Sequence, residues 1–194
     1  MVFLFAGLTI YPAAFSQRSA ADVVRLQNDD IIIEPIENAN GLPGVQAMFL
    51  IQGSASEIWK MLNDYKNYKS IYGGIDSLKV IQQDSDGATV EYWSDVGTWK
   101  YLGVKVHFVL RRNYDSACRE LSWKRVSGDL KEIEGGWEII DSPVMGKKLL
   151  IYKTFIKYGG LIPTKIIRKR AMKAAESMAY RLREWLSNNP DLYN

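Results

Sequence analysis

The segment from Leu161 to Ser187, near the end of the chain, places apolar residues at the spacing of a long amphipathic α-helix. Pro163 is compatible with a first helical turn, and the sequence Asn188-Asn189-Pro190 ends the helix. The apolar face consists of Ile166, Ile167, Met172, Ala174, Ala175, Met178, Ala179, Leu182, Trp185 and Leu186. Such a face is stable only when another element covers it. The rest of the chain must therefore supply an apolar surface as long as this helix.

The residues before this helix have the pattern of successive β-strands without an intervening helix. The predicted strands are Leu78–Gln83, Thr89–Val96, Trp99–Arg111, Glu120–Val126, Leu130–Ile140 and Lys148–Lys157. Asp86-Gly87 predicts a hairpin turn between the first two. A meandering antiparallel sheet is therefore expected, and its concave face is the only surface available to cover the helix.

The region from residue 17 to residue 44 is expected to be an N-terminal extension. Ala20 to Leu26 predicts a short helix that lacks a good cap, and Asp30 to Ile36 predicts a strand. Pro35 places that strand at an edge of the sheet, because proline cannot donate to a central ladder. Turn residues from Asn38 to Gly44 then lead into the main domain.

The main domain is expected to begin with a strand from Val45 to Gln52. Ser54 and Glu57 have the spacing of a capping box, in which each side chain binds a free backbone amide at the start of a helix. A second short helix is predicted from Tyr65 to Ile71, and Gly73-Gly74 ends it. The complete pattern is that of an α+β domain.

The order of these elements resembles the START-like (SRPBCC) superfamily, which includes polyketide cyclase/dehydrase and coenzyme-Q-binding-like proteins. The resemblance covers roughly residues 46–188 and rests on the order of short motifs. These are Ser54-x-x-Glu57-x-Trp59, Asp64-Tyr65-x-x-Tyr68, Leu121-x-Trp123, Gly128…Gly135-Gly136-Trp137 and Leu161-Ile162-Pro163. It implies a helix-grip fold, in which a curved antiparallel sheet wraps around a long C-terminal helix, with two short helices after the first main strand. It also implies an apolar cavity between sheet and helix, in a domain over residues 45–188 that is followed by a tail over residues 189–194.

The alternation of side chains along the strands predicts which residues face that cavity. We predict a ligand-binding surface made of aromatic and flexible apolar side chains: Tyr92, Trp123, Trp137, Tyr152, Met172 and Met178. Gly135 would leave room beside Trp137 for a bulge or for a ligand. The alternative for each residue is ordinary packing in a filled core.

Three functions are compatible with these features. The first is non-catalytic binding or transport of a hydrophobic small molecule such as a lipid, a quinone or an isoprenoid. The second is an enzyme of the aromatic polyketide cyclase or dehydratase type, which would need general acid and base groups inside the cavity. The predicted interior positions contain almost no Asp, Glu or His, so no catalytic residue is assigned. The third is a membrane or protein adaptor that uses the basic C-terminal helix.

Metal and cofactor chemistry is not predicted. Cys118 is the only cysteine and His107 the only histidine, which excludes cysteine-based metal sites and zinc sites with several histidines. His107 shares its strand face with Lys105 and Arg111, so it is expected at the surface.

Charge is distributed unevenly, although the net charge is only +3. No Asp or Glu occurs from residue 142 to residue 175, whereas nine Lys and Arg residues do. Four of these, Lys165, Arg168, Lys169 and Lys173, are predicted to contact an anionic membrane surface transiently, or an acidic partner. The alternative is an ordinary solvated face, and the small net charge does not favour nucleic acid.

The first residues are apolar from Val2 to Phe15, a run too short to span a membrane. Ala14-Phe15-Ser16 offers small residues for signal-peptide cleavage, although the usual charged start is missing. Residues 1–16 are therefore interpreted as an export signal or an apolar arm. A signal would place the protein in the periplasm or outside the cell, and the alternative is the cytoplasm.

Overall fold

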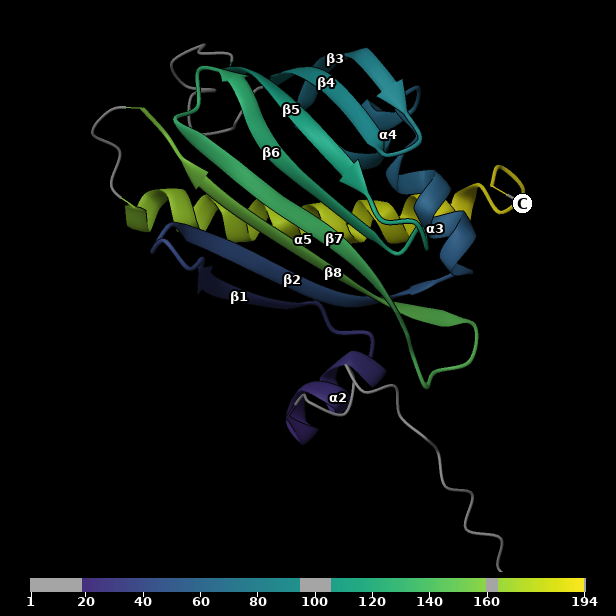
Figure 1. Ribbon diagram of the computed structural model, residues 1–194. Helices are drawn as coiled ribbons and strands as arrows, with labels where there is room; N and C mark the ends of the chain where they lie inside the picture. The colour runs from purple at the N-terminus through teal and green to yellow at the C-terminus, as the bar shows by residue number, and fades with distance from the viewer. Residues whose placement is uncertain (1–18, 95–105, 160–163, 194) are drawn as a thin grey trace, which may run out of the picture.

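The computed structural model describes residues 19–94, 106–159 and 164–193 (Figure 1). Eight antiparallel strands form one curved sheet, and the long helix α5 (Thr164–Asn188) lies along its concave side (Figure 1). The predicted helix-grip arrangement is confirmed. Several predictions fall at least partly outside the described residues: those for residues 1–16, the end of the predicted strand Thr89–Val96, the part of the predicted strand Trp99–Arg111 before residue 106, and the predicted start of the last helix over residues 161–163.

The sheet has the order β1-β2-β8-β7-β6-β5-β4-β3. Its strands are β1 (Ile32–Glu37), β2 (Pro43–Gln52), β3 (Ile75–Asp84), β4 (Gly87–Ser94), β5 (Val106–Tyr114), β6 (Glu120–Gly128), β7 (Glu132–Asp141) and β8 (Lys147–Lys157). Strands β3 to β8 form the predicted meander, and β8 then pairs with β2, with Phe49 opposite Leu150. Pro35 lies in the edge strand β1, as predicted.

Three shorter helices precede the meander: α2 (Ala20–Gln27), α3 (Ala55–Leu62) and α4 (Tyr68–Tyr72). The capping box of α3 is confirmed, because Ser54 Oγ accepts from Glu57 N at 3.2 Å and Glu57 Oε2 accepts from Ser54 N at 2.7 Å. The expectation of a poorly capped α2 is wrong, because Ser19 Oγ accepts from Asp22 N at 3.1 Å.

The two faces of the sheet are covered by different helices. On the convex side, α2 covers a small apolar cluster, and its Leu26 is completely buried there. This cluster also contains Ile32, Met48, Leu50, Leu149 and Ile151. On the concave side, the main core extends over every strand from β2 to β8 and includes residues of α3, α4 and α5.

Helix α5 is packed unevenly along its length. Its C-terminal half buries Met178, Ala179 and Leu182 in the main core. Two residues assigned to the buried face, Ile166 and Ala174, are instead exposed, and this detail of the prediction is wrong. The reason is that the backbone of α5 mainly neighbours β2, β1 and α4, so only a narrow strip of its first half is covered.

Within the described part of the chain, no helix is both long enough and apolar enough to cross a membrane.

Candidate functional site

A group of aromatic rings on the concave face lies between the sheet and the helices. Trp137 on β7 and Tyr152 on β8 have ring centroids 4.7 Å apart, and Trp123 on β6 lies 5.8 Å from Tyr152. These strands are adjacent, with Trp137 directly opposite Tyr152 in the ladder. Cross-strand pairing therefore brings the three rings together.

The rings continue towards the short helices. Tyr72 of α4 lies 6.4 Å from Trp137 and stacks on Tyr68 at 4.0 Å. Tyr68 in turn lies 5.7 Å from Tyr92 of β4. A continuous series of rings, here called the aromatic series (Tyr68, Tyr72, Tyr92, Trp123, Trp137 and Tyr152), therefore crosses the concave side from α4 to β8.

Four of the six predicted lining residues belong to this series, namely Tyr92, Trp123, Trp137 and Tyr152. Met178 of α5 is buried in the same core, whereas Met172 packs in a smaller cluster with Val45, Ala47, Ala175 and Tyr152. All six lie on the concave side of the sheet, between it and the helices. Their role in ligand binding stays a prediction.

Burial raises the pKa of three phenol groups of this series, those of Tyr68, Tyr72 and Tyr152. It raises the pKa of Tyr152 to about 12, although a hydrogen bond with Thr154 acts in the opposite direction. Burial also raises the pKa of Tyr68 and of Tyr72 well above the ordinary value. At neutral pH these side chains are therefore uncharged groups that can donate or accept hydrogen bonds.

The sequence interpretation missed Arg112 of β5, which is only 2 % exposed. Its Nη2 donates to the backbone O of Leu62 at 3.0 Å and to Asn63 Oδ1 at 3.3 Å. The guanidinium also lies 5.0 Å from the ring centroid of Tyr65 and 5.8 Å from that of Tyr68. The sequence does contain an indication that Arg112 is buried. It occupies the same alternate positions as the apolar residues of its strand, so its side chain faces the core.

The buried polar groups limit the chemistry available on the concave side. Among the described residues, the buried polar or charged side chains are Ser94, Arg112 and Thr154. Burial lowers the pKa of the Arg112 guanidinium, whereas the surrounding tyrosines raise it. The second effect is larger, so the pKa of Arg112 lies above its ordinary value. The interior therefore offers one permanent cation and several hydroxyl groups, with no carboxylate or imidazole among its described buried side chains.

The space between the first half of α5 and the sheet is small. A volume of about 20 Å³ lies among Val45, Thr154, Ile156, Ile167 and Ala171, at the first half of the helix. This volume holds roughly one water molecule. A ligand of several hundred Å³ can pass this point only if the first half of α5 moves away from the sheet.

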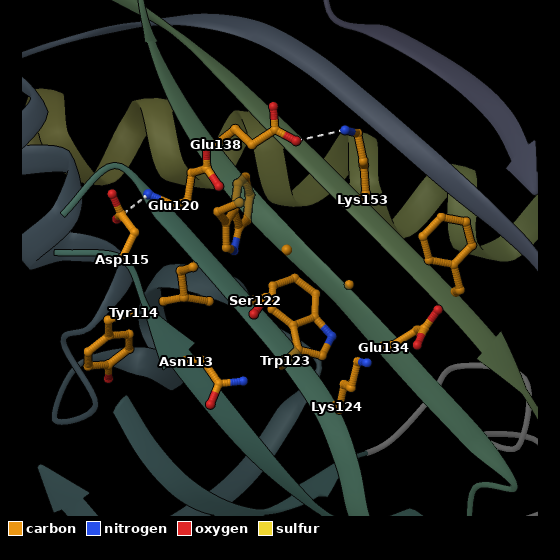
Figure 2. A pocket seen from close by; sticks show the side chains of 15 residues that line it. Asn113, Tyr114, Asp115, Glu120, Ser122, Trp123, Lys124, Glu134, Glu138 and Lys153 are labelled. Atoms are coloured by element: carbon orange, nitrogen blue, oxygen red, sulfur yellow. Dashed lines mark hydrogen bonds and ion pairs between the residues drawn. The ribbon is translucent and has the colours of Figure 1, made fainter. Parts of the chain in front are cut away.

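A larger hollow of about 560 Å³ lies across β5 to β8 on the side of the sheet away from α5 (Figure 2). Gly136 contributes no side chain to this surface, which leaves a shallow trough between its neighbours. Two charged groups on its walls, Glu138 and Lys153, are paired with each other at 2.7 Å (Figure 2). Trp123 and Trp137 also border this hollow, but it is open and carries charged side chains on its walls, unlike the enclosed apolar cavity that the sequence predicts, so we do not assign it as the ligand site.

The predicted basic contact residues lie on the first half of α5. Lys165, Lys169 and Lys173 are exposed, and Arg168 forms an ion pair of 3.4 Å with Glu37 of the edge strand. His107 is partly exposed and contacts Glu91 at 2.8 Å, away from the aromatic series. No group of His, Cys, Asp and Glu side chains that could hold a metal ion occurs in the described ranges.

Residues 51–183 match a family model described as polyketide cyclase/dehydrase and lipid transport. Among solved structures, a STAR-related lipid transfer protein from Xanthomonas axonopodis is 13 % identical, with a TM-score of 0.64 over 81 % of this chain and 93 % of that one. Human StAR-related lipid transfer protein 5 is 11 % identical, with a TM-score of 0.65 over 83 % of this chain and 84 % of that one. The Zhui aromatase/cyclase from Streptomyces sp. R1128 is 11 % identical, with a TM-score of 0.61 over 83 % and 98 % of the two chains.

No curated protein matches the chain by sequence. Identities this low establish a shared fold and do not choose among the activities that the fold supports.

Proposed function

Because the chain belongs to the polyketide cyclase/dehydrase and lipid transport family, we propose that it is a non-catalytic carrier. Its cargo is a hydrophobic small molecule of the lipid, quinone or isoprenoid class, held between the sheet and α5. The membership supports binding of a hydrophobic ligand in general, and the side chains of this chain support the carrier function in particular.

The observation that carries the proposal is the aromatic series on the concave face. Trp137 and Tyr152 are in ring contact, and Tyr72 extends the contact to α4. Large aromatic surfaces with hydroxyl groups at their rims are suited to an apolar ligand that carries a polar group.

A carrier also explains the chemistry of the buried groups better than a cyclase does. General acid–base catalysis uses a group whose pKa lies near the working pH. Burial moves the pKa of Tyr72 and of Tyr152 away from neutrality, and the described buried polar side chains include no carboxylate or histidine. These groups can orient a ligand without exchanging protons with it.

Entry of the ligand is expected at the first half of α5. The opposite end of the helix is fixed, because Trp185 Nε1 donates to the Tyr193 hydroxyl at 2.9 Å and that hydroxyl donates to Asp64 Oδ2 at 2.7 Å. The first half, in contrast, exposes Ile166 and is tied to the sheet edge by the Arg168–Glu37 ion pair. An exposed ion pair of this kind contributes roughly 0–1 kcal/mol. Separation would also expose the small cluster that Met172 and Ala175 form with Val45 and Ala47, so this end separates from the sheet at a lower cost than the opposite end, which is packed in the main core.

The carrier proposal is tested by native mass spectrometry of the protein purified from a lipid-rich extract. We expect a co-purifying lipophile, and we expect members of a lipid and quinone panel to raise the melting temperature. Tyr152→Ala should weaken binding of any lipid found, whereas Tyr180→Ala, at an exposed position of α5, should not. A protein that carries no lipophile and is stabilised by no member of the panel would contradict the proposal.

We further propose that the exposed lysines on the first half of α5 (Lys165, Lys169 and Lys173) hold the protein at an anionic membrane while the ligand enters or leaves. Each basic group near such a surface contributes about 1 kcal/mol of attraction. The double variant Lys169→Glu/Lys173→Glu should lose binding to phosphatidylglycerol vesicles at low salt. Lys79→Glu, at an exposed position of β3, is the control. Equal vesicle binding by both variants would dismiss this surface.

A further inference from the structure

Two of the three guanidinium nitrogens of the buried Arg112 lack a hydrogen-bond acceptor among the described residues. Its Nη2 is engaged by the carbonyl of Leu62 and by Asn63, at the end of α3. Its Nε and Nη1 are buried and have no hydrogen-bond partner among the residues that the structure describes. Buried polar groups are nearly always paired, so two unpaired nitrogens on a buried cation require an explanation.

The surrounding protein does not neutralise this cation with an acid. No described carboxylate forms an ion pair with Arg112. Asp64 follows Asn63 in the chain, but its carboxylate binds other groups. It accepts hydrogen bonds from Asn67 Nδ2 at 2.8 Å and from the Tyr193 hydroxyl at 2.7 Å. The rings of Tyr65 and Tyr68 attract the positive charge, but they leave Nε and Nη1 without an acceptor.

A structural role accounts for only part of this arrangement. Donation to the carbonyl of Leu62 stabilises the C-terminal end of α3, where the helix dipole favours a positive charge. One nitrogen is sufficient for that contact. Keeping a whole guanidinium buried for it is costly, unless another acceptor also binds the group.

The aromatic series begins beside this cation. Tyr68 contacts the guanidinium and stacks on Tyr72, which is followed by Trp137 and Tyr152. Tyr152 also packs with Met172 of α5, in the half of the helix where entry is expected. A polar anchor therefore lies at one end of an apolar path, and the movable half of α5 lies at the other.

Resting on the carrier function proposed above, we infer that Arg112 binds the carboxylate of an amphipathic ligand whose apolar chain lies along the aromatic series. A carboxylate matches the site because a single negative charge balances a single cation. A phosphate monoester carries close to two negative charges at neutral pH, and one of them would remain buried without a partner. The ligand class is thus a long-chain or isoprenoid carboxylic acid, in preference to a neutral lipid or an alkyl phosphate monoester.

The test compares three probes that share one chain: hexadecanoate, methyl hexadecanoate and hexadecyl phosphate. Their affinities for the full protein are measured at neutral pH by titration calorimetry and by quenching of tryptophan fluorescence. We expect hexadecanoate to bind at least about tenfold more tightly than its methyl ester, because the ester leaves the cation unpaired. Hexadecyl phosphate should bind more weakly than hexadecanoate.

Two variants locate the effect. Arg112→Gln removes the buried cation and should bring the ratio of the two affinities close to one, while methyl hexadecanoate still binds. Arg111→Gln is the matched control, because Arg111 is the adjacent arginine and binds Asp84 at 3.0 Å at the surface. It should keep the preference for the acid.

The outcomes separate this inference from the carrier function. Equal binding of acid and ester by the unmodified protein overturns the role of Arg112 and leaves the carrier function intact. Tighter binding of the alkyl phosphate overturns the choice of carboxylate, and a folded Arg112→Gln variant that keeps the full preference overturns the assigned residue. Failure of all three probes, together with no co-purifying lipophile, overturns both proposals. The comparison in the unmodified protein needs no variant, so it decides the question even if Arg112→Gln does not fold.

Discussion

Gly135 on β7 shows how a single residue shapes the aromatic series. It lies opposite Trp123 in the ladder, and a Cβ atom at this position would lie 2.6 Å from Cζ2 of that indole. The backbone O of Lys153 would obstruct the same atom. The sequence predicts that Gly135 leaves room beside Trp137 for a bulge or a ligand, but the ring of Trp123 occupies the space next to this glycine. The glycine is therefore needed for the close approach of a neighbouring ring.

The corresponding prediction is that Gly135→Ala destabilises the protein by about 2 kcal/mol, because the added methyl group must displace Trp123 and the neighbouring backbone. Urea denaturation followed by circular dichroism measures the change. Ser122→Ala, at an exposed position of the adjacent strand, is the control and should change the free energy of unfolding by about 0.5 kcal/mol or less. A Gly135→Ala protein as stable as the control would show that Trp123 can move at no cost.

At the scale of elements, α5 is held at one end by a small hydrogen-bonded network. The Tyr193 hydroxyl accepts from Trp185 and donates to Asp64, which joins the end of the chain to the segment between α3 and α4. Lys60 Nζ also donates to the backbone O of Tyr193 at 2.8 Å. This end of α5 is therefore the fixed point about which the opposite half can move.

Tyr193→Phe is expected to lower the free energy of unfolding by about 1–2 kcal/mol, because Asp64 and Trp185 each lose a buried hydrogen-bond partner. Hydrogen exchange should also become faster in the last turns of α5. Tyr180→Phe provides the comparison, since Tyr180 lies on the same helix and is 57 % exposed. If the two variants unfold at the same denaturant concentration, the network does not anchor the helix.

At the scale of the whole molecule, a group of largely buried tyrosines couples stability to alkaline pH. Burial is the main cause of the raised pKa of Tyr65, Tyr68 and Tyr72. The folded protein therefore keeps these phenols protonated at pH values where the unfolded chain releases the protons. Their contribution to stability is complete below the unfolded pKa of about 10 and is lost progressively as the pH rises above it.

We accordingly expect the urea midpoint to stay level up to about pH 9 and to fall progressively as the pH rises above about 10, the pKa of tyrosine in the unfolded chain. The ultraviolet absorbance of phenolate from these three residues should increase only as the protein unfolds. The exposed Tyr180 serves as an internal reference, and Tyr180→Phe removes its signal. Complete ionisation of the tyrosines in a protein that remains folded would contradict the buried position of the aromatic series.

The sequence alone was sufficient to predict the structural features that depend on residues close together in the chain. The capping box of Ser54 and Glu57, the alternation that turns Trp137 and Tyr152 inwards, and the long apolar stripe of α5 are all local patterns with fixed periods. Because the order of such patterns limits how layers can pack, the curved sheet around a long helix was predictable as well.

The tertiary structure decided the features that depend on residues far apart in the chain. Pairing of β8 with β2 fixes where α5 lies, and it leaves Ile166 outside the covered strip. Arg112 gains its significance from Tyr65 and Tyr68, which precede it by more than forty residues. Local periodicity determines which way a side chain points, whereas only the folded register determines which distant groups it meets. For that reason the four aromatic residues of the strands were identified from the sequence, whereas Tyr68, Tyr72 and the buried cation beside them were not.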